Sequence, residues 1–187
     1  MDNQAEIINQ ILHFISESEQ LKETERFAFK TDGEAESTAE HTWRLSLFVA
    51  LFCSFYPHLN KAEALEIALI HDLAELKTGD IPAIDQVDAQ KKAEQETLAF
   101  NSLTAVLPAE MATHYDRLFL DYQLGRTEEA RLVKALDKAE TILQHVQGKN
   151  PPDFNYQFNL DYGKEYFSDP FLKDLRRILD QATSDKI

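Results

Sequence analysis

The segment from residue 61 to residue 76 carries the clearest hydrophobic pattern in the chain. Ala64, Leu65, Ala68, Leu69 and Leu73 follow one another at spacings of one, three and four. On a helix with about 3.6 residues per turn, such positions form one apolar stripe. The segment is nearly apolar all round, which is typical of a helix in the middle of a bundle. Any polar side chain on this helix therefore needs a partner, because an unpaired polar group is costly to bury.

Helical patterns recur along the whole chain, and the glycines and prolines fall between them. Helices are expected at about 3–20, 38–56, 61–76, 86–106, 109–122, 127–147 and 164–183. No alternating apolar and polar run reaches a convincing length, so the predicted fold class is all-α. A chain of 187 residues suits one well-buried core, and a single domain over 1–187 is expected.

Two stretches lack a helical pattern, residues 21–37 and the aromatic-rich residues 153–162. Either stretch could form a lid. For the second, the favoured interpretation is a connection that packs Phe154, Tyr156 and Phe158 on the bundle, because aromatic side chains mostly serve packing.

Composition narrows the class of protein and its location. With 33 acidic and 19 basic residues the formal net charge is −14, and the basic residues are scattered, so nucleic acid is not an expected partner. No apolar stretch approaches the ~20 residues of a membrane span, and the N-terminus lacks the profile of a signal peptide. A cytoplasmic protein without membrane contact is expected. The single cysteine, Cys53, lies among hydrophobic neighbours and is predicted to be a core residue.

The polar side chains at the end of the 61–76 segment are candidates for chemistry. His71 and Asp72 are adjacent, and Glu75 follows one turn later, so the three side chains project to one side of a helix. His41 and Asp137 lie on two other apolar helical segments. Imidazole and carboxylate groups are good ligands for first-row divalent metals. This order of residues points to a divalent-metal site between core helices, and so to hydrolysis of a phosphate ester.

Each of these residues also has an ordinary structural interpretation. A lone His or Asp in a helix is more often hydrogen-bonded than catalytic, and Asp80, in the ThrGlyAspIlePro turn at 78–82, could be merely a turn residue. The other histidines, at positions 13, 58, 114 and 145, form no obvious second cluster and are interpreted as surface or packing residues. The convergence of several ligand-type residues favours the metal site over coincidence.

Four segments together resemble one family. GluHisThrTrpArg at 40–44, HisAspLeuAlaGlu at 71–75, ThrGlyAspIlePro at 78–82 and LeuValLysAlaLeuAspLysAlaGlu at 132–140 look like the HD-domain metal-dependent phosphohydrolases. The closest branch contains the bacterial 5′-deoxynucleotidases and their eukaryotic HD-domain relatives. The resemblance covers about residues 5–147, and residues 148–187 would form a helical C-terminal extension.

The resemblance implies roles for particular residues. It implies one divalent cation, such as cobalt, manganese or another transition metal, held by His41, His71, Asp72 and Asp137. Glu75 matches the family's catalytic acidic residue, and Arg26 matches the arginine that orients the substrate phosphate.

The substrate contacts implied by the resemblance include Phe27, His41, Asp72 and Asp137 as well as the loop that meets the nucleoside, Asp80, Ile81, Pro82 and Ala83. The bacterial deoxynucleotidases place a tryptophan where this chain has Phe27, so a preference for deoxyribose does not follow.

The expected function is removal of the 5′-phosphate from nucleoside or deoxynucleoside monophosphates by a metal-activated water. Two alternatives remain open at this point: a phosphodiesterase or nucleoside polyphosphate hydrolase, and a non-catalytic helical interaction module stapled by its metal. The resemblance also suggests a homodimer.

Overall fold

The structure is a computed structural model, and it describes residues 2–80 and 88–187. The described residues form eight α-helices: α1 (Asp2–Ser18), α2 (Thr38–Phe52), α3 (Lys61–Ile70), α4 (Glu75–Thr78), α5 (Ala89–Thr104), α6 (Ala109–Leu124), α7 (Glu128–Gln147) and α8 (Pro170–Ser184). Short 3-10 helices are η1 (Glu19–Lys22), η2 (Cys53–Phe55), η4 (Tyr156–Leu160) and η5 (Lys164–Tyr166). The expected all-α class is confirmed.

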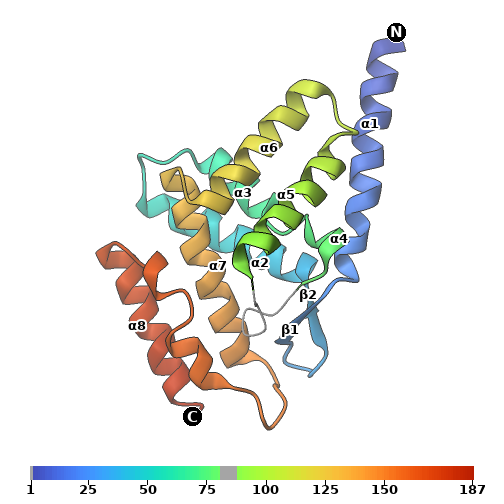
Figure 1. Cartoon of the computed structure of the whole chain (residues 1–187). Coiled ribbons are helices and arrows are strands. Elements are labelled where there is room, and N and C mark those ends of the chain that lie inside the picture. Colours follow the sequence, from blue (N-terminus) through green and yellow to red (C-terminus); the bar gives the residue numbers. More distant parts are fainter. Residues whose placement is uncertain (1, 81–87) are drawn as a thin grey trace.

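Helix α7 is the centre of the bundle, with α2, α3, α6 and α8 packed around it (Figure 1). More than half of its residues are buried, including Leu132, Val133, Leu136 and Ile142. Because α7 is surrounded on several sides, its polar residue Asp137 is also buried. The central helix thus carries a buried carboxylate that has to be satisfied by other side chains or by an ion.

Side chains at the helix N-termini fix where the core helices begin. Ser37 and Glu40 form a reciprocal capping box at the start of α2, Asn60 caps α3 and Thr127 caps α7. Each cap satisfies a backbone N–H that has no partner within the helix. The helices that carry the candidate site residues therefore have defined starting points.

Residues 21–37, expected to form a loop, contain a small hairpin, which corrects the sequence prediction. Strands β1 (Glu25–Phe29) and β2 (Ala35–Ser37) pair antiparallel. Gly33, with φ of 96°, lies in the turn, a backbone conformation that side chains with a Cβ rarely adopt. Strands of five and three residues are too short for their alternation to stand out from a loop.

The expected continuous helix over 61–76 is also wrong, because α3 ends at Ile70. From residue 70 onward the backbone tightens: the N–H groups of Leu73 and Glu75 donate to carbonyls three residues back, at 3.1 and 3.0 Å. Helix α4 then begins at Glu75. The break falls at His71 and Asp72, where the chain turns its polar side chains into the interior.

The C-terminal helix begins later than the expected residue 164. Helix α8 starts at Pro170, and Asp169 caps it by accepting from the N–H groups of Phe171 and Leu172 at 2.8 and 3.0 Å. Proline is favoured in the first helical turn, where a missing N–H costs nothing. The preceding residues form η5 and a bend.

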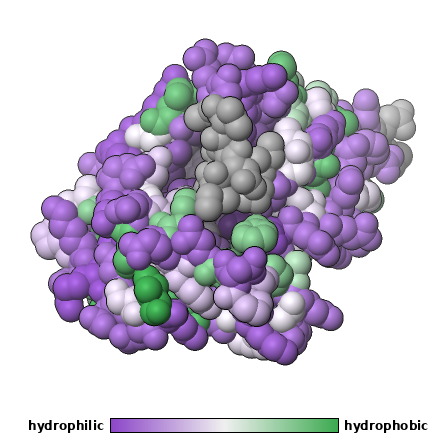
Figure 2. Space-filling model, turned by 60° about the horizontal axis from the view of Figure 1, so that its bottom comes forward, coloured by the Kyte–Doolittle hydropathy of each residue, from purple (hydrophilic) through white to green (hydrophobic). Residues whose placement is uncertain are grey.

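The core lies between α2, α3, α6 and α7, and Cys53 is buried in it, as predicted. None of the described helices is long and apolar enough to cross a membrane. The face brought forward in Figure 2 is largely hydrophilic, with isolated hydrophobic groups.

Candidate metal centre and cavity

His71 is oriented by the end of α3. Its Nδ1 lies 2.9 Å from the carbonyl oxygen of Ala68. A carbonyl can only accept, so Nδ1 carries the proton and the lone pair of the neutral ring is on Nε2. Nε2 lies 3.0 Å from Oδ2 of Asp72. The break in the helix therefore points Nε2 of His71 at a carboxylate.

His41, on α2, is oriented in a corresponding way from the opposite side. Its Nδ1 contacts Oε2 of Glu140, whose other oxygen accepts from Nε of Arg44 at 2.6 Å. Nε2 of His41 lies 3.3 Å from Oδ1 of Asp137 and 3.7 Å from Oδ2 of Asp72. A carboxylate on Nδ1 fixes the ring and leaves Nε2 for a ligand, as is usual for metal-binding histidines.

The ligand-type atoms of His41, His71 and Asp137 all lie within 4.8 Å of one another. Nε2 of His41 and Nε2 of His71 are both buried, and neither has a hydrogen-bond partner among the described residues. Buried polar atoms in proteins are almost always paired, so two orphaned nitrogens facing two carboxylates require an explanation. Two imidazole nitrogens and two carboxylate oxygens form a donor set that fits a divalent transition-metal ion.

Asp137 is held from outside the cluster. Its Oδ2 accepts from the hydroxyl of Tyr122 at 2.8 Å and from Nζ of Lys138 at 2.9 Å. Burial favours the neutral acid, but the charge of Lys138 and the nearby imidazole of His41 lower the pKa of Asp137 well below its usual value. Asp137 is therefore ionised, and its Oδ1 lies on the side of Nε2 of His41.

The acidic surroundings favour a positive charge at His41. Burial and Arg26 lower the pKa of this imidazole, but Glu140 and Asp137 more than offset them and raise it to about 10. The same excess of negative charge would stabilise a bound cation at Nε2.

A second group of ligand-type atoms belongs to Glu36, His41 and Glu140. It shares His41 with the first group, and Nδ1 of His41 already contacts Glu140. The group formed by His41, His71 and Asp137 is therefore the better ion site.

Arg26 reaches the cluster from β1. Its Nη1 donates to Oδ2 of Asp72 at 3.3 Å, its Nη2 donates to the hydroxyl of Thr141 at 3.2 Å, and its Nε lies 3.7 Å from Oε2 of Glu36. The guanidinium is nearly buried and lines a cavity that opens above the cluster. The hairpin that sequence reasoning missed is the element that places this cation.

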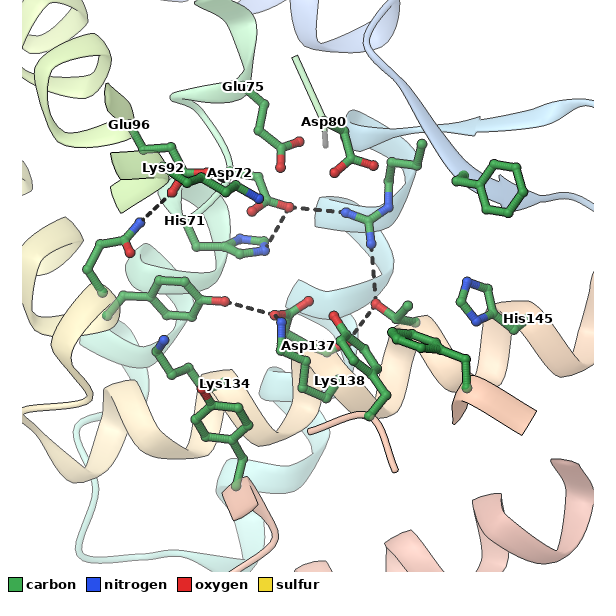
Figure 3. Close-up of a pocket in the computed structure, with 18 of the residues that line it drawn as sticks. His71, Asp72, Glu75, Asp80, Lys92, Glu96, Lys134, Asp137, Lys138 and His145 are labelled. Atoms are coloured by element: carbon green, nitrogen blue, oxygen red, sulfur yellow. Dashed lines mark hydrogen bonds and ion pairs between the residues drawn. The ribbon is translucent and has the colours of Figure 1, made fainter. Parts of the chain in front are cut away.

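Glu75, the first residue of α4, and Asp80 both line the same cavity (Figure 3). Oε2 of Glu75 accepts from the hydroxyl of Thr38 at 3.1 Å. Burial raises the pKa of Glu75 well above its usual value, and the charges of Asp72 and Asp80 raise it further. Glu75 is thus an acidic residue that retains a proton more readily than an exposed carboxyl does.

The cavity has a volume of about 410 Å³. One wall is aromatic, built by Phe27 and by residues that follow α7: Phe154, Phe158, Tyr162 and Tyr166. Phe27 stacks on Phe154 with ring centroids 5.9 Å apart, and Phe154 packs edge-on against His145 at 4.9 Å. The predicted packing of Phe154 on the bundle is confirmed, and the same segment also borders the cavity.

The structure brings most of the sequence-predicted site residues together, since Arg26, Phe27, His71, Asp72, Glu75, Asp80 and Asp137 line the cavity and His41 lies beneath it. Asp80 lies just after α4 and also lines the cavity. Ile81, Pro82 and Ala83 lie outside the described residues.

Sequence reasoning missed the residues that hold the ligand-type side chains. Glu140 lies three positions after Asp137 on α7, and Arg44 lies three positions after His41 on α2, so helical spacing could have found both. Tyr122, on α6, reaches Asp137 only through the tertiary packing of α6 on α7. No local signal in the sequence identifies it.

The remaining histidines lie apart from the cluster. His58 pairs with Glu128 at 3.1 Å and His114 with Glu66 at 2.7 Å, both at the surface. His145 is buried and its Nδ1 lies 2.8 Å from Oδ1 of Asn159. The interpretation of these three as surface or packing residues agrees with their positions.

This chain has a buried cluster of histidines and aspartates between core helices, beneath a cavity. These features place it in the class of helical metal-dependent hydrolases. The HD domain family matches residues 18–173, and the chain belongs to this family.

Curated proteins similar to this chain include two that are named 5′-deoxynucleotidases. The chain is 32% identical over 136 residues to the 5′-deoxynucleotidase HDDC2 of Bos taurus, covering 72% of this chain and 65% of that protein. It is 35% identical over 140 residues to the 5′-deoxynucleotidase hdd1 of Schizosaccharomyces pombe, covering 72% of this chain and 70% of that protein. The chain thus spans about two thirds of the length of these relatives.

Solved structures share the fold over nearly the whole chain. A predicted metal-dependent phosphohydrolase from Magnetospirillum magnetotacticum MS-1 is 25% identical to this chain, with a TM-score of 0.81. The match covers 96% of this chain and 94% of that protein's chain. A conserved hypothetical protein from Pyrococcus furiosus has a TM-score of 0.71 at 25% identity, covering 92% of this chain and 99% of its own. The family resemblance drawn from the four sequence segments is confirmed.

Proposed function

We propose that this chain is a metal-dependent phosphohydrolase that removes the 5′-phosphate from nucleoside monophosphates, deoxynucleoside monophosphates among them. The observation that carries the proposal is the pair of buried, unpartnered Nε2 atoms of His41 and His71, which face Asp72 and Asp137. The names of the relatives in cattle and fission yeast, both called 5′-deoxynucleotidases, support the substrate class.

In this proposal His41, His71, Asp72 and Asp137 hold one divalent cation. When bound, such an ion would supply Lewis-acid activation of water and compensation for phosphate charge. Cobalt or manganese is proposed because mixed imidazole and carboxylate donors suit transition metals.

Arg26 is proposed to orient the phosphate. Its planar guanidinium borders the cavity beside Asp72, and arginine presents several N–H donors in a geometry that matches phosphate oxygens. Thr141 and Glu36 hold the guanidinium from behind, so little side-chain entropy is lost when a phosphate arrives.

Glu75 is proposed to move the proton in the reaction. Its carboxyl lines the cavity, is held by Thr38, and lies outside the group of ligand atoms. A buried carboxyl can accept a proton from the attacking water or donate one to the leaving 5′-oxygen.

The rest of the cavity is proposed to take the nucleoside. Its volume of about 410 Å³ falls in the range of small-molecule sites, which are usually part apolar with a few placed polar groups. Phe27 and Phe154 offer flat apolar surface, and Asp80 with the loop of Ile81, Pro82 and Ala83 would meet the sugar or base.

The test is phosphate release from a panel of ribo- and deoxyribonucleoside 5′-monophosphates with cobalt or manganese. The panel includes a cyclic dinucleotide and nucleoside di- and triphosphates, because faster turnover of those compounds would favour a phosphodiesterase or a polyphosphate hydrolase instead. Metal binding without release from any compound would favour a non-catalytic, metal-stapled module.

Three further features belong to the proposal: a homodimer, a cytoplasmic location, and a single domain over 1–187. The mass of the particle in solution, measured by light scattering, tests the first. A mass of one chain of 21.5 kDa at micromolar concentration would contradict it.

A further inference from the structure

Helix α7 forms the floor of the cavity. Lys134, Asp137, Lys138 and Thr141 lie at spacings of three, four and seven residues, share one face of the helix and all line the cavity. Figure 3 shows Lys134 on one side of Asp137 along this helix and His145 on the other. Asp137 thus has a lysine one turn toward the N-terminus of α7.

Four cationic side chains of the described residues line the cavity, and three of them pair with carboxylates. Arg26, Lys92 and Lys138 have carboxylate oxygens at 3.3, 3.4 and 2.9 Å. Lys134 has no ion pair or side-chain hydrogen bond within the part of the chain that the structure describes, and it is the exception.

The ammonium of Lys134 is held by two aromatic rings. Nζ lies 4.8 Å from the ring centroid of Tyr122 and 5.4 Å from that of Tyr166. Tyr122 also donates its hydroxyl to Asp137, so one residue contacts both the lysine and the candidate metal ligand. Burial lowers the pKa of Lys134, and the charge of Lys138 lowers it further. A half-buried ammonium that has no carboxylate partner is stabilised more by an anionic ligand than a cation that is already paired.

The arrangement along α7 places Lys134 opposite Arg26. Arg26 donates to Thr141, which lies about 6 Å from Asp137 along the helix axis, toward the C-terminus of α7. Lys134 lies about 4.5 Å from Asp137 along the same axis, in the opposite direction. A phosphate positioned over Asp137 would therefore have a guanidinium on one side and an ammonium on the other.

We propose that Lys134 is a phosphate-binding residue of this site and holds a non-bridging oxygen of the substrate phosphate on the side opposite Arg26. This inference rests on the proposed phosphohydrolase function. It assigns to Lys134 a direct contact with the phosphate, so that the phosphate dianion is held by two separate cations of the protein.

The experiment compares Lys134→Met with Lys173→Met, which removes the same charge from an exposed lysine of α8 that lies outside the cavity. Binding of inorganic phosphate to the metal-loaded protein is measured by calorimetry, and KM and kcat are measured with the best monophosphate. Lys134→Met should weaken phosphate binding on the order of 10- to 100-fold, mainly through a higher dissociation constant and KM. Lys173→Met should change phosphate binding and KM by less than about threefold, because surface substitutions away from a site rarely matter more.

Lys134→Arg serves as the rescue variant and should restore most of the phosphate binding, because it returns the charge to the same side of Asp137. Metal content and thermal midpoint are recorded for every variant; if Lys134→Met is unstable, Lys134→Gln replaces it in the comparison. Phosphate binding by Lys134→Met that equals phosphate binding by Lys173→Met would overturn the inference while the proposed function stands. Absence of phosphate release by the unsubstituted chain would contradict the proposed function itself.

Discussion

Glu140→Gln tests the part of the site that sequence reasoning missed. Glu140 is fully buried on α7 and contacts Nδ1 of His41 with one oxygen, while its other oxygen accepts from Arg44 at 2.6 Å. The substitution keeps the size of the side chain and removes its charge. Nε2 of His41 then becomes a weaker donor to a cation, because the carboxylate no longer polarises the imidazole or fixes its tautomer.

The expected loss of metal affinity is on the order of 10- to 100-fold, or about 1.4 to 2.7 kcal/mol. The free energy of unfolding should also fall by about 1 to 3 kcal/mol, because the ion pair with Arg44 is lost. The lower end is expected, since the Arg44 side chain is 23% exposed and retains a hydrogen bond to Gln147 at 3.3 Å.

The assay is a competition titration of cobalt or manganese against a chromophoric chelator, at a temperature well below the unfolding midpoint of each variant. Glu110→Gln, an exposed glutamate on α6, provides the matched control for the loss of one negative charge. Equal metal affinity in the Glu140→Gln and Glu110→Gln proteins would refute the reasoning that Glu140 supports His41 as a ligand.

Three further predictions follow from the site and its surroundings. Glu75→Gln should keep metal affinity within about threefold but lower kcat by about 100-fold or more, because a proton-transferring group is lost; metal loss in parallel with activity would argue for a structural role. Arg26→Ala should lower kcat/KM about 10- to 100-fold, with Arg26→Lys intermediate, and an unchanged rate would remove Arg26 from the site. Burial lowers the pKa of His145, so the unfolded chain takes up a proton near pH 6.5 before the folded protein does. The free energy of unfolding should therefore fall as the pH drops below about 6.5, by up to about 1.4 kcal/mol per pH unit. His145→Gln should remove this pH dependence when the free energy of unfolding is measured by urea titration at several pH values. The same pH dependence in both proteins would contradict the attribution to His145.

The helices of the core could be predicted from the sequence because their apolar spacing is long and regular. Segments 109–122 and 127–147 differ from α6 and α7 by no more than two residues at any end. The hairpin that carries Arg26 could not be predicted, because its strands are too short to show a period. The end of α3 at Ile70 was missed because the apolar pattern continues through Leu73 although the backbone tightens.

Some residues of the candidate site could likewise be predicted from the sequence and others could not. His71, Asp72 and Asp137 stand out in the sequence because they interrupt apolar helical runs, and their convergence in space agrees with that signal. Tyr122 and Lys134 gain their significance only from the packing of α6 on α7 and of the residues after α7 against both. Such contacts depend on how the helices are rotated about their axes, which periodicity alone does not specify.

The most direct test of the central claim is the number of divalent ions bound per chain, determined by elemental analysis and equilibrium titration for the unsubstituted protein and for Asp137→Asn. We predict one tightly bound ion per chain in the first protein, and loss of both that ion and phosphate release in the second. An Asp137→Asn protein that still binds one ion with unchanged affinity and hydrolyses monophosphates at the original rate would contradict the account.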